Sequence, residues 1–89
     1  MHSDAGLEQN VPNSFNKTTT IGYILPQQFS KAQIVVTDDS GKIVKQINVS
    51  GSRKGNLNID TAKLPTGVYN YSLIIDKRVI STKQMIMGK

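Results

Sequence analysis

Cysteine is absent from this 89-residue chain, and histidine occurs once, as His2. Without cysteine the protein forms no disulfide bond, thiolate metal site or cysteine nucleophile, and its redox compartment stays open. His2 lies in a polar stretch at the start of the sequence, where a linker residue is a better interpretation than a ligand or a base. Since no other histidine is present, the rest of the chain offers no Ser–His pair for nucleophilic catalysis.

Long apolar runs are missing as well. No stretch approaches the roughly 18 to 20 apolar residues that a membrane-spanning helix needs, and the N-terminal residues lack the apolar core of a secretory signal. The chain has 37% hydrophobic residues, 19% charged residues and a mean hydropathy of -0.30. These values are typical of a soluble globular domain, and the length allows one small core.

Catalytic acids and metal ligands are equally scarce. The six Asp and Glu residues lie in predicted turns, at strand ends or in the N-terminal tail, and only Asp38 and Asp39 are adjacent. Adjacent side chains at a strand end point apart, which favours a role in a turn, with a weak calcium contact as the alternative. No glycine motif for phosphate binding occurs. We therefore expect no enzymatic activity, no metal and no cofactor.

The net charge of +5 allows an acidic partner but does not require one. The eleven Lys and Arg residues form no tract, and the three tyrosines and two phenylalanines mostly fall on predicted apolar faces. Core packing explains such aromatic residues better than a platform for stacking nucleobases. We therefore expect no nucleic-acid partner.

Alternation of apolar and polar residues indicates a β-protein. Runs rich in Ile, Val, Thr and Tyr are separated by clusters of Gly, Pro, Asn and Asp, and no window has helical spacing. Short antiparallel strands predict a two-sheet sandwich of six or seven strands. The expected strands are 19–25, 31–37, 42–50, 56–60, 68–75 and 79–87. The expected inward residues are Ile21, Tyr23, Leu25, Ala32, Ile34, Val36, Leu57, Ile59, Tyr69, Tyr71, Leu73 and Ile75, with Leu7, Val11 and Phe15 anchoring a turn-rich segment before them.

Three irregularities are expected within this pattern. Gly41 suits the positive φ of a tight turn. The apolar residues of segment 42–50 change parity, which predicts a β-bulge near 45–46. The connection at 76–77 lacks the glycine that a type I′ turn prefers, so a longer turn including Arg78 fits equally well.

The last expected strand has apolar residues on both faces, because Ile80 and Ile86 share one parity while Val79, Met85 and Met87 share the other. Two interpretations are open. In the first, the N-terminal segment covers this strand on both sides. In the second, Met85 and Met87 form an adaptable apolar stripe on an edge strand, available to a partner by strand addition or groove docking.

The order of these motifs resembles the type A C-terminal sorting domain of type IX secretion cargo. The matching motifs are the opening segments 7–16, 18–21 and 25–26, the turn with Asp38 and Gly41, the small-Gly-x-Tyr strand within 64–73 and the Lys-rich end 83–89. The resemblance covers residues 7–89, with 1–6 as a linker. Ser14 departs from it where the family usually has a second proline, and Lys77 where a hairpin glycine is common.

The resemblance implies a seven-stranded immunoglobulin-like sandwich, all-β and antiparallel, that acts as a secretion signal without chemistry of its own. It implies an N-terminal cargo domain that brings its own export signal, so that this sequence is part of a larger protein. It further implies periplasmic transit, recognition by an outer-membrane shuttle barrel, and removal by a sortase-like cysteine protease at the outer-membrane surface or outside the cell.

The residues expected to serve this role form three groups. The receptor docking end is Lys83, Met85, Met87, Gly88 and Lys89, the fold determinants are Gly41, Gly67 and Tyr69, and the cleavage region is Ser3, Asp4, Ala5, Gly6 and Leu7. Gly67 is expected to supply a turn conformation that only glycine adopts at low cost. A competing hypothesis is an immunoglobulin-like adhesion or carbohydrate-binding module retained on a surface protein. Coplanar rings facing solvent would favour that module, whereas we expect Tyr69 and Tyr71 to be buried.

Overall fold

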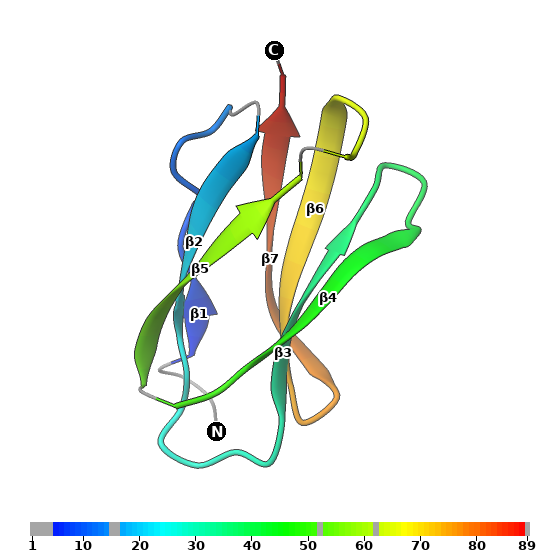
Figure 1. Cartoon of the computed structure of the whole chain (residues 1–89). Coiled ribbons are helices and arrows are strands. Elements are labelled where there is room, and N and C mark those ends of the chain that lie inside the picture. Colours follow the sequence, from blue (N-terminus) through cyan, green and yellow to red (C-terminus); the bar gives the residue numbers. More distant parts are fainter. Residues whose placement is uncertain (1–4, 15–16, 52, 62, 89) are drawn as a thin grey trace.

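The computed structural model describes residues 5–14, 17–51, 53–61 and 63–88, and within these ranges the chain forms seven β-strands and no helix. The strands are β1 (Gly6–Leu7), β2 (Thr18–Ile24), β3 (Ala32–Thr37), β4 (Ile43–Val49), β5 (Lys54–Asp60), β6 (Gly67–Ile75) and β7 (Arg78–Met87). They form two antiparallel sheets around one core (Figure 1). The expected all-β, immunoglobulin-like sandwich is therefore confirmed.

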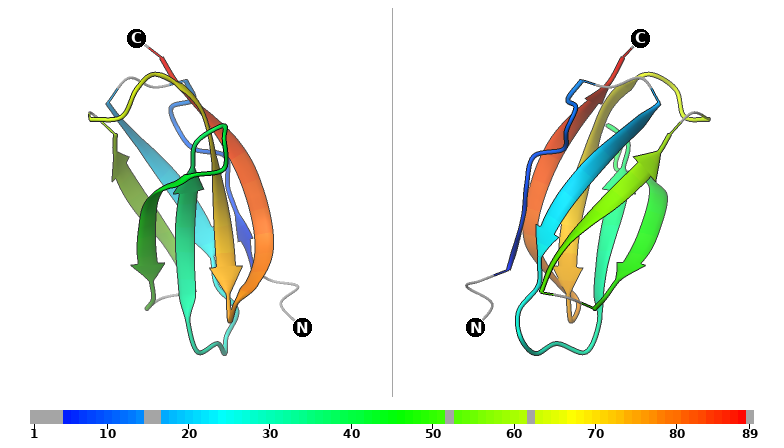
Figure 2. Two further views of the ribbon diagram at one scale, coloured as in Figure 1. Left: turned by 90° about the vertical axis from the view of Figure 1, so that its right-hand side faces the viewer. Right: turned by 60° about the vertical axis from the view of Figure 1, so that its left-hand side comes forward.

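The two sheets contain three and four strands. Their strand orders are β1-β2-β5 and β4-β3-β6-β7. Figure 2 shows the four-stranded sheet toward the viewer on the left and the three-stranded sheet on the right. In a constant-type immunoglobulin sandwich the fourth strand pairs with the fifth, whereas here β4 pairs with β3. The edges β4 and β5 consequently flank one side of the sandwich, and β7 and β1 flank the other.

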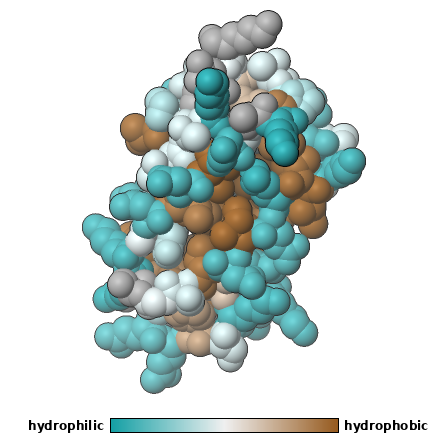
Figure 3. Space-filling view, in the orientation of Figure 1, coloured by the Kyte–Doolittle hydropathy of each residue, from teal (hydrophilic) through white to brown (hydrophobic). Residues whose placement is uncertain are grey.

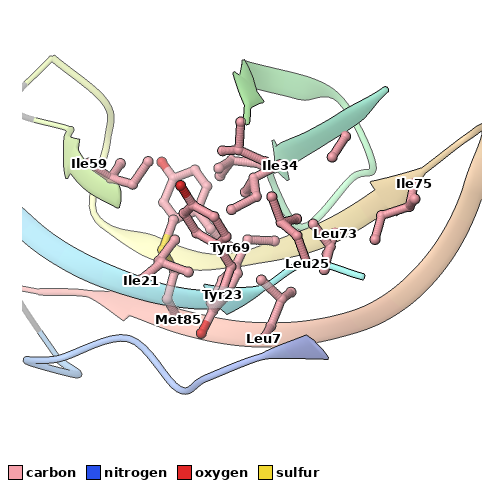
Figure 4. Close-up of a cluster of buried hydrophobic side chains, with 14 of the residues drawn as sticks. Leu7, Ile21, Tyr23, Leu25, Ile34, Ile59, Tyr69, Leu73, Ile75 and Met85 are labelled. Carbon is pink, nitrogen blue, oxygen red and sulfur yellow. The ribbon is translucent and has the colours of Figure 1, made fainter. Parts of the chain in front are cut away.

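The core is built from the inward side chains that the alternation predicts. Ile21, Ile34, Val36, Tyr71, Leu73 and Ile75 are fully buried, and Tyr23, Leu25, Ala32, Ile59 and Tyr69 are buried with them. Figure 4 shows side chains of this cluster, among them Ile21, Ile34 and Leu73, meeting between the two sheets. Because each large aliphatic side chain contributes roughly 1.5–3 kcal/mol when buried, this shared face is the main force that holds the sheets together.

Three apolar residues depart from the prediction. Val35 lies on the outer face of its sheet but is only 7% exposed. Leu57 is half-buried instead of buried, since β5 is an edge strand. Val11, predicted as an anchor, is 70% exposed, so that expectation is wrong. Phe15, the third expected anchor, lies outside the described residues.

Two β-bulges restore the inward alternation where the sequence changes parity. On β4, Lys45 pairs with Val36 and Ile43 pairs with Thr37, so Val44 is left out of the pairing with β3. This bulge lies just before the predicted position, 45–46. On β7 the register skips Ile80. This second bulge puts Val79 on the outer face while Met85 and Met87 face inward, which explains the apolar residues of both parities in β7.

The β6–β7 hairpin has the shorter of the two predicted turns. Ile75 pairs with Arg78, and the two turn residues Asp76 and Lys77 have φ values of 49° and 71°, as in a type I′ turn. The Asp76 carboxylate accepts hydrogen bonds from the backbone N–H groups of residues 30 and 31, each at 2.9 Å. These tertiary bonds, together with the tolerance of Asp for a left-handed conformation, support the turn without glycine.

Apolar side chains reach the surface on the side of the sandwich between β4 and β5. Figure 3 shows apolar atoms at the surface between these strands. Val44 and Ile47 of β4 and Leu57 of β5 are partly buried and pack against the core.

The outer face of the four-stranded sheet is formed by the side chains that alternate with the core residues. By strand pairing its members are Gln33, Val35, Thr37, Ile43, Gln46, Asn48, Val68, Asn70, Ser72, Ile74, Val79, Thr82, Gln84 and Ile86.

Candidate functional site

Strand β7 is the edge of the four-stranded sheet and carries most of the predicted docking end. Met85 is fully buried opposite Tyr69, and Met87 is 3% exposed opposite Gly67. The predicted open stripe of methionines is therefore wrong. The inward face of β6 continues onto β7 at these pairs, so the two flexible side chains fill the core.

The alternative interpretation, cover on both sides by the N-terminal segment, holds only for the edge of β7, because Val79 and Ile86 on its outer face stay exposed. Residues 7–13, here called the N-terminal strap, continue from β1 and run between β2 and β7 (Figure 2, right). On the β2 side, Val11 and Thr20 exchange two backbone hydrogen bonds of 2.9 Å, and the Glu8 N–H donates to the Gly22 oxygen at 2.9 Å. The strap thus continues the three-stranded sheet toward β7.

Two amide side chains of the strap satisfy the edge of β7. Gln9 Nε2 donates to the carbonyl oxygen of Gln84 at 2.7 Å, and the Ile86 N–H donates to Asn13 Oδ1 at 2.8 Å. An edge strand normally leaves such backbone groups free to pair with another chain. Here amide side chains replace a neighbouring strand, so strand addition at these two residues is blocked.

Tyr71 anchors the strap from inside the core. Its hydroxyl donates to the Glu8 oxygen at 2.7 Å and accepts from the Asn10 N–H at 2.8 Å. The Asn10 side chain, 1% exposed, donates to Thr19 Oγ1 and to the Pro12 oxygen, each at 3.0 Å. Burial raises the pKa of the Tyr71 hydroxyl, and the bond from Asn10 acts in the opposite sense. The hydroxyl stays protonated and can donate to Glu8.

Gly67 and Tyr69, two of the predicted fold determinants, act together where β5 leads into β6. The Tyr69 hydroxyl donates to the carbonyl oxygen of Pro65, four residues upstream, as in the tyrosine corner of immunoglobulin-like sandwiches. Gly67 has a φ of 153°, a conformation that side chains with a Cβ rarely adopt. The prediction that Gly67 supplies a glycine-specific conformation is confirmed.

The third fold determinant, Gly41, closes the β3–β4 turn with a φ of 90°, and its N–H donates to the Asp38 oxygen at 3.0 Å. The Asp38 carboxylate accepts from Ser40 Oγ at 2.7 Å, from Ser40 N at 3.0 Å and from Lys42 N at 2.9 Å. The bond from the Ser40 hydroxyl, followed by that from Lys42 N–H, lowers the pKa of the Asp38 carboxyl. The predicted role of Asp38 in a turn is confirmed.

The β3–β4 turn and the tyrosine corner lie side by side. Asp38 and Lys42 from the turn, and Pro65, Gly67 and Tyr69 from the corner, line one surface cavity of about 360 Å³. The family's turn motif and its small-Gly-x-Tyr motif therefore meet at the same end of the sandwich.

The other predicted docking residues do not form one surface with the methionines. Lys83 is half-buried opposite Tyr71, and an inward-facing charge on an edge strand opposes pairing with other chains. Gly88 is half-buried just after β7. Lys89 lies outside the described residues.

Part of the predicted cleavage region belongs to the folded sheet. Gly6–Leu7 forms β1 and pairs with the end of β2, and Leu7 is 8% exposed. Ala5 is half-buried and packs against the core. Ser3 and Asp4 lie outside the described residues.

The strap network was not predicted from the sequence. Gln9, Asn10 and Asn13 were interpreted as residues of a turn-rich segment, yet each bonds to a distant strand. The available signal was three amide side chains within the short segment 7–13. That many donors and acceptors exceeds the needs of local turns.

The tyrosines are turned into the core, as predicted for Tyr69 and Tyr71, which are 4% and 0% exposed. Tyr23 is also buried. These rings are therefore not available as a flat stacking surface for sugars, the feature on which the carbohydrate-binding hypothesis depends. Within the described ranges, no helix is long and apolar enough to cross a membrane, and no three His, Cys, Asp or Glu side chains are grouped to hold a metal ion.

The fold is a small seven-stranded β-sandwich in which the turn motif and the tyrosine-corner motif meet at one end. Comparison with protein families matches residues 11–87 to the secretion system C-terminal sorting domain. The chain belongs to this family, the sorting domains of type IX secretion, and the resemblance seen in the sequence is confirmed. Comparisons with curated proteins and with solved structures return no match. The domain is a C-terminal sorting signal for export across the outer membrane to the cell surface or beyond.

Proposed function

We propose that the folded domain is a passenger-independent recognition element, bound in the periplasm by an outer-membrane shuttle barrel and later removed by a sortase-like cysteine protease. The observation that carries this proposal is the closure of β7 by the strap, in which Gln9 and Asn13 bond to backbone atoms of the terminal strand. A receptor for unrelated cargo must read features that the passenger does not alter. A strand fixed by its own domain meets that need.

Within this proposal the docking residues have two different roles. Lys83, Gly88 and Lys89 contact the receptor, whereas Met85 and Met87 act indirectly by holding β7 against the core. The burial of both methionine side chains supports this division. Passenger independence follows because the core contacts of β7 lie within the domain.

The end of β7 and the strand β1, which contains Gly6 and Leu7 of the proposed cleavage region, lie toward opposite ends of the sandwich (Figure 1), whose longest dimension is 39 Å. A receptor at the end of β7 and a protease near β1 would therefore not compete for one surface. Because Gly6 and Leu7 are paired with β2, and a protease binds its substrate as an extended chain, we place the scissile bond before Gly6, in the region Ser3–Gly6.

The test is export of a reporter that carries an inner-membrane export signal and this chain at its C-terminus. In a host with type IX secretion we expect the reporter at the surface or in the medium, shortened by loss of the domain. In an otherwise identical host without the translocon we expect the full-length fusion in the periplasm. Equal release from both hosts would refute the proposal.

A further inference from the structure

The strand-paired positions on the outer face of the four-stranded sheet hold no charged residue, although the chain has eleven Lys and Arg and six Asp and Glu. Charge occurs at one end of the face, where Lys31, Asp76 and Lys77 line a surface cavity together with Gln33 and Ile74. The polar positions hold amides, such as Gln33 and Gln84, and hydroxyls, such as Ser72 and Thr82. This face is turned toward the viewer in the left panel of Figure 2. Depletion of charge distinguishes the centre of protein interfaces from the remaining surface.

The same face also gathers most of the exposed apolar side chains. Among the described residues the exposed large hydrophobic residues are Val11, Ile43, Val68, Val79 and Ile86, and all but Val11 lie on this face. Val79 is 63% and Ile43 55% exposed. Scattered exposed apolar residues need no explanation, but their concentration on one uncharged face indicates a contact surface.

Polar groups of the face are already held by their neighbours. Gln46 Nε2 donates to Gln33 Oε1 at 2.7 Å, between β4 and β3. The hydroxyl oxygens of Ser72 and Thr82 are 2.8 Å apart, between β6 and β7. Side chains that are fixed before contact lose less conformational entropy when a partner binds.

The outer face of the three-stranded sheet is different, because Lys54 and Asp60 point outward from β5 and the Glu8 carboxylate lies over Gly22 of β2. The paired positions of the four-stranded face offer no charged group to a strongly charged partner and no aromatic ring for stacking on sugar. Its matching partner is a neutral protein surface.

We propose that this outer face is a contact surface for a second copy of the chain. Amide side chains both donate and accept hydrogen bonds, so a face of amides, hydroxyls and aliphatic groups is complementary to itself about a two-fold axis. The charged residues lie outside the paired positions of this face, and those at its end are of both signs, Lys31, Lys77 and Asp76. Two copies can therefore meet face to face without opposing like charges, which would otherwise repel identical chains.

The size of the face indicates a weak dimer. Four strands about 4.8 Å apart and a rise of about 3.4 Å per residue give a face of roughly 20 by 25 Å with its side chains, so that two facing copies bury about 1,000 Å². Stable specific interfaces begin somewhat above this area, and transient ones lie near it. Association is expected to be reversible and, without ion pairs, nearly independent of salt.

Sedimentation equilibrium of the whole chain tests this inference, from about 10 μM to about 1 mM. We expect the average mass to rise with concentration from 9.8 kDa toward that of a dimer. Asn48→Lys and Gln84→Lys place a charge on the outer face and should each weaken association at least about tenfold. Asn56→Lys makes the same charge change on the outer face of the other sheet, also at an edge strand, and should weaken it less than about twofold.

Circular dichroism melts establish that all three variants fold. A chain that stays monomeric up to the highest concentration would overturn the inference, as would equal weakening by Asn56→Lys. If the face variants reduce export of the reporter while the chain is monomeric, the surface belongs to a contact with the export machinery, and the dimer is excluded. Normal export by a chain that stays monomeric would refute the proposed dimer without contradicting the proposed sorting function.

Discussion

The Tyr71 hydroxyl donates a hydrogen bond of 2.7 Å to the carbonyl oxygen of Glu8, 63 positions earlier in the sequence. The ring is fully buried between the sheets, while Glu8 belongs to the strap that runs toward the edge of β7. This bond therefore joins the core to the segment that closes the terminal strand.

Replacement of this hydroxyl should destabilise the domain. In Tyr71→Phe the Glu8 oxygen and the Asn10 N–H lose their partner, and we expect the free energy of unfolding to fall by about 1–3 kcal/mol. Urea denaturation measures the change. Tyr23→Phe is the matched control, because its hydroxyl lies beside Gly55 and away from the strap. An equal loss in both variants would contradict the anchoring role.

The amide contacts of the strap are predicted to protect one backbone group of β7. Asn13→Ala removes the acceptor of the Ile86 N–H, so this amide should exchange with solvent at least about tenfold faster. Hydrogen exchange followed by NMR resolves the individual amide. Amides of β7 that bond to β6 should be unchanged, and Asn48→Ala on β4 should leave Ile86 unaffected. Unaltered exchange in Asn13→Ala would show that the strap does not cover the edge in solution.

The backbone conformation of Gly67 predicts that any side chain at this position destabilises the domain. Gly67→Ala forces a Cβ into a φ of 153° and should lower the free energy of unfolding by about 1–3 kcal/mol. Gly88→Ala is the control, because no atom lies within 4 Å of the added Cβ and the φ is not in the positive region. Thermal or urea unfolding of both variants gives the comparison, and similar stability would argue against strain at position 67.

The hydrogen bonds that the Asp38 carboxylate accepts predict that the free energy of unfolding falls in acid. The pKa of its carboxyl is lowered by the bonds from Ser40 and Lys42, so the stabilisation is fully present above the unfolded-state pKa of about 4. It is lost as the pH falls through the folded-state pKa. In Asp38→Asn this part of the pH dependence should disappear from urea midpoints measured between about pH 2 and pH 7. Asp39→Asn keeps the bonds of Asp38 and should retain the acid loss.

Export assays combined with stability measurements should distinguish residues that contact the receptor from residues that stabilise the fold. Residues added after Lys89, or Lys89→Ala, should block secretion of the reporter without changing the free energy of unfolding. Met85→Ala should instead lower stability by about 2–5 kcal/mol, because it empties part of the core. Its effect on export should follow the fraction of unfolded fusion, measured by proteolysis. Normal secretion of the extended chain would argue against a docking signal at the C-terminal end.

The interior of the sandwich was largely readable from the sequence. Side chains alternate between the two faces of a strand whatever it pairs with, so Ile34 and Leu73 were placed correctly before any partner strand was known. The glycine-specific conformations at Gly41 and Gly67 were predicted for a similar reason, since they depend on local backbone geometry. The family match over residues 11–87 rests on the same local motifs.

Whether the edge of β7 is open or covered could be decided only from the tertiary structure. Its sequence fits an open apolar strand and a covered one equally well, and the choice depends on where residues 7–13 lie, more than 70 positions away. The bulge at Ile80 belongs to the pairing of β6 with β7 and turns Val79 outward while Met85 faces the core. Alternation is a property of each strand, which the sequence determines. Register, edges and their cover are relations between distant segments, and only packing of the whole chain decides them.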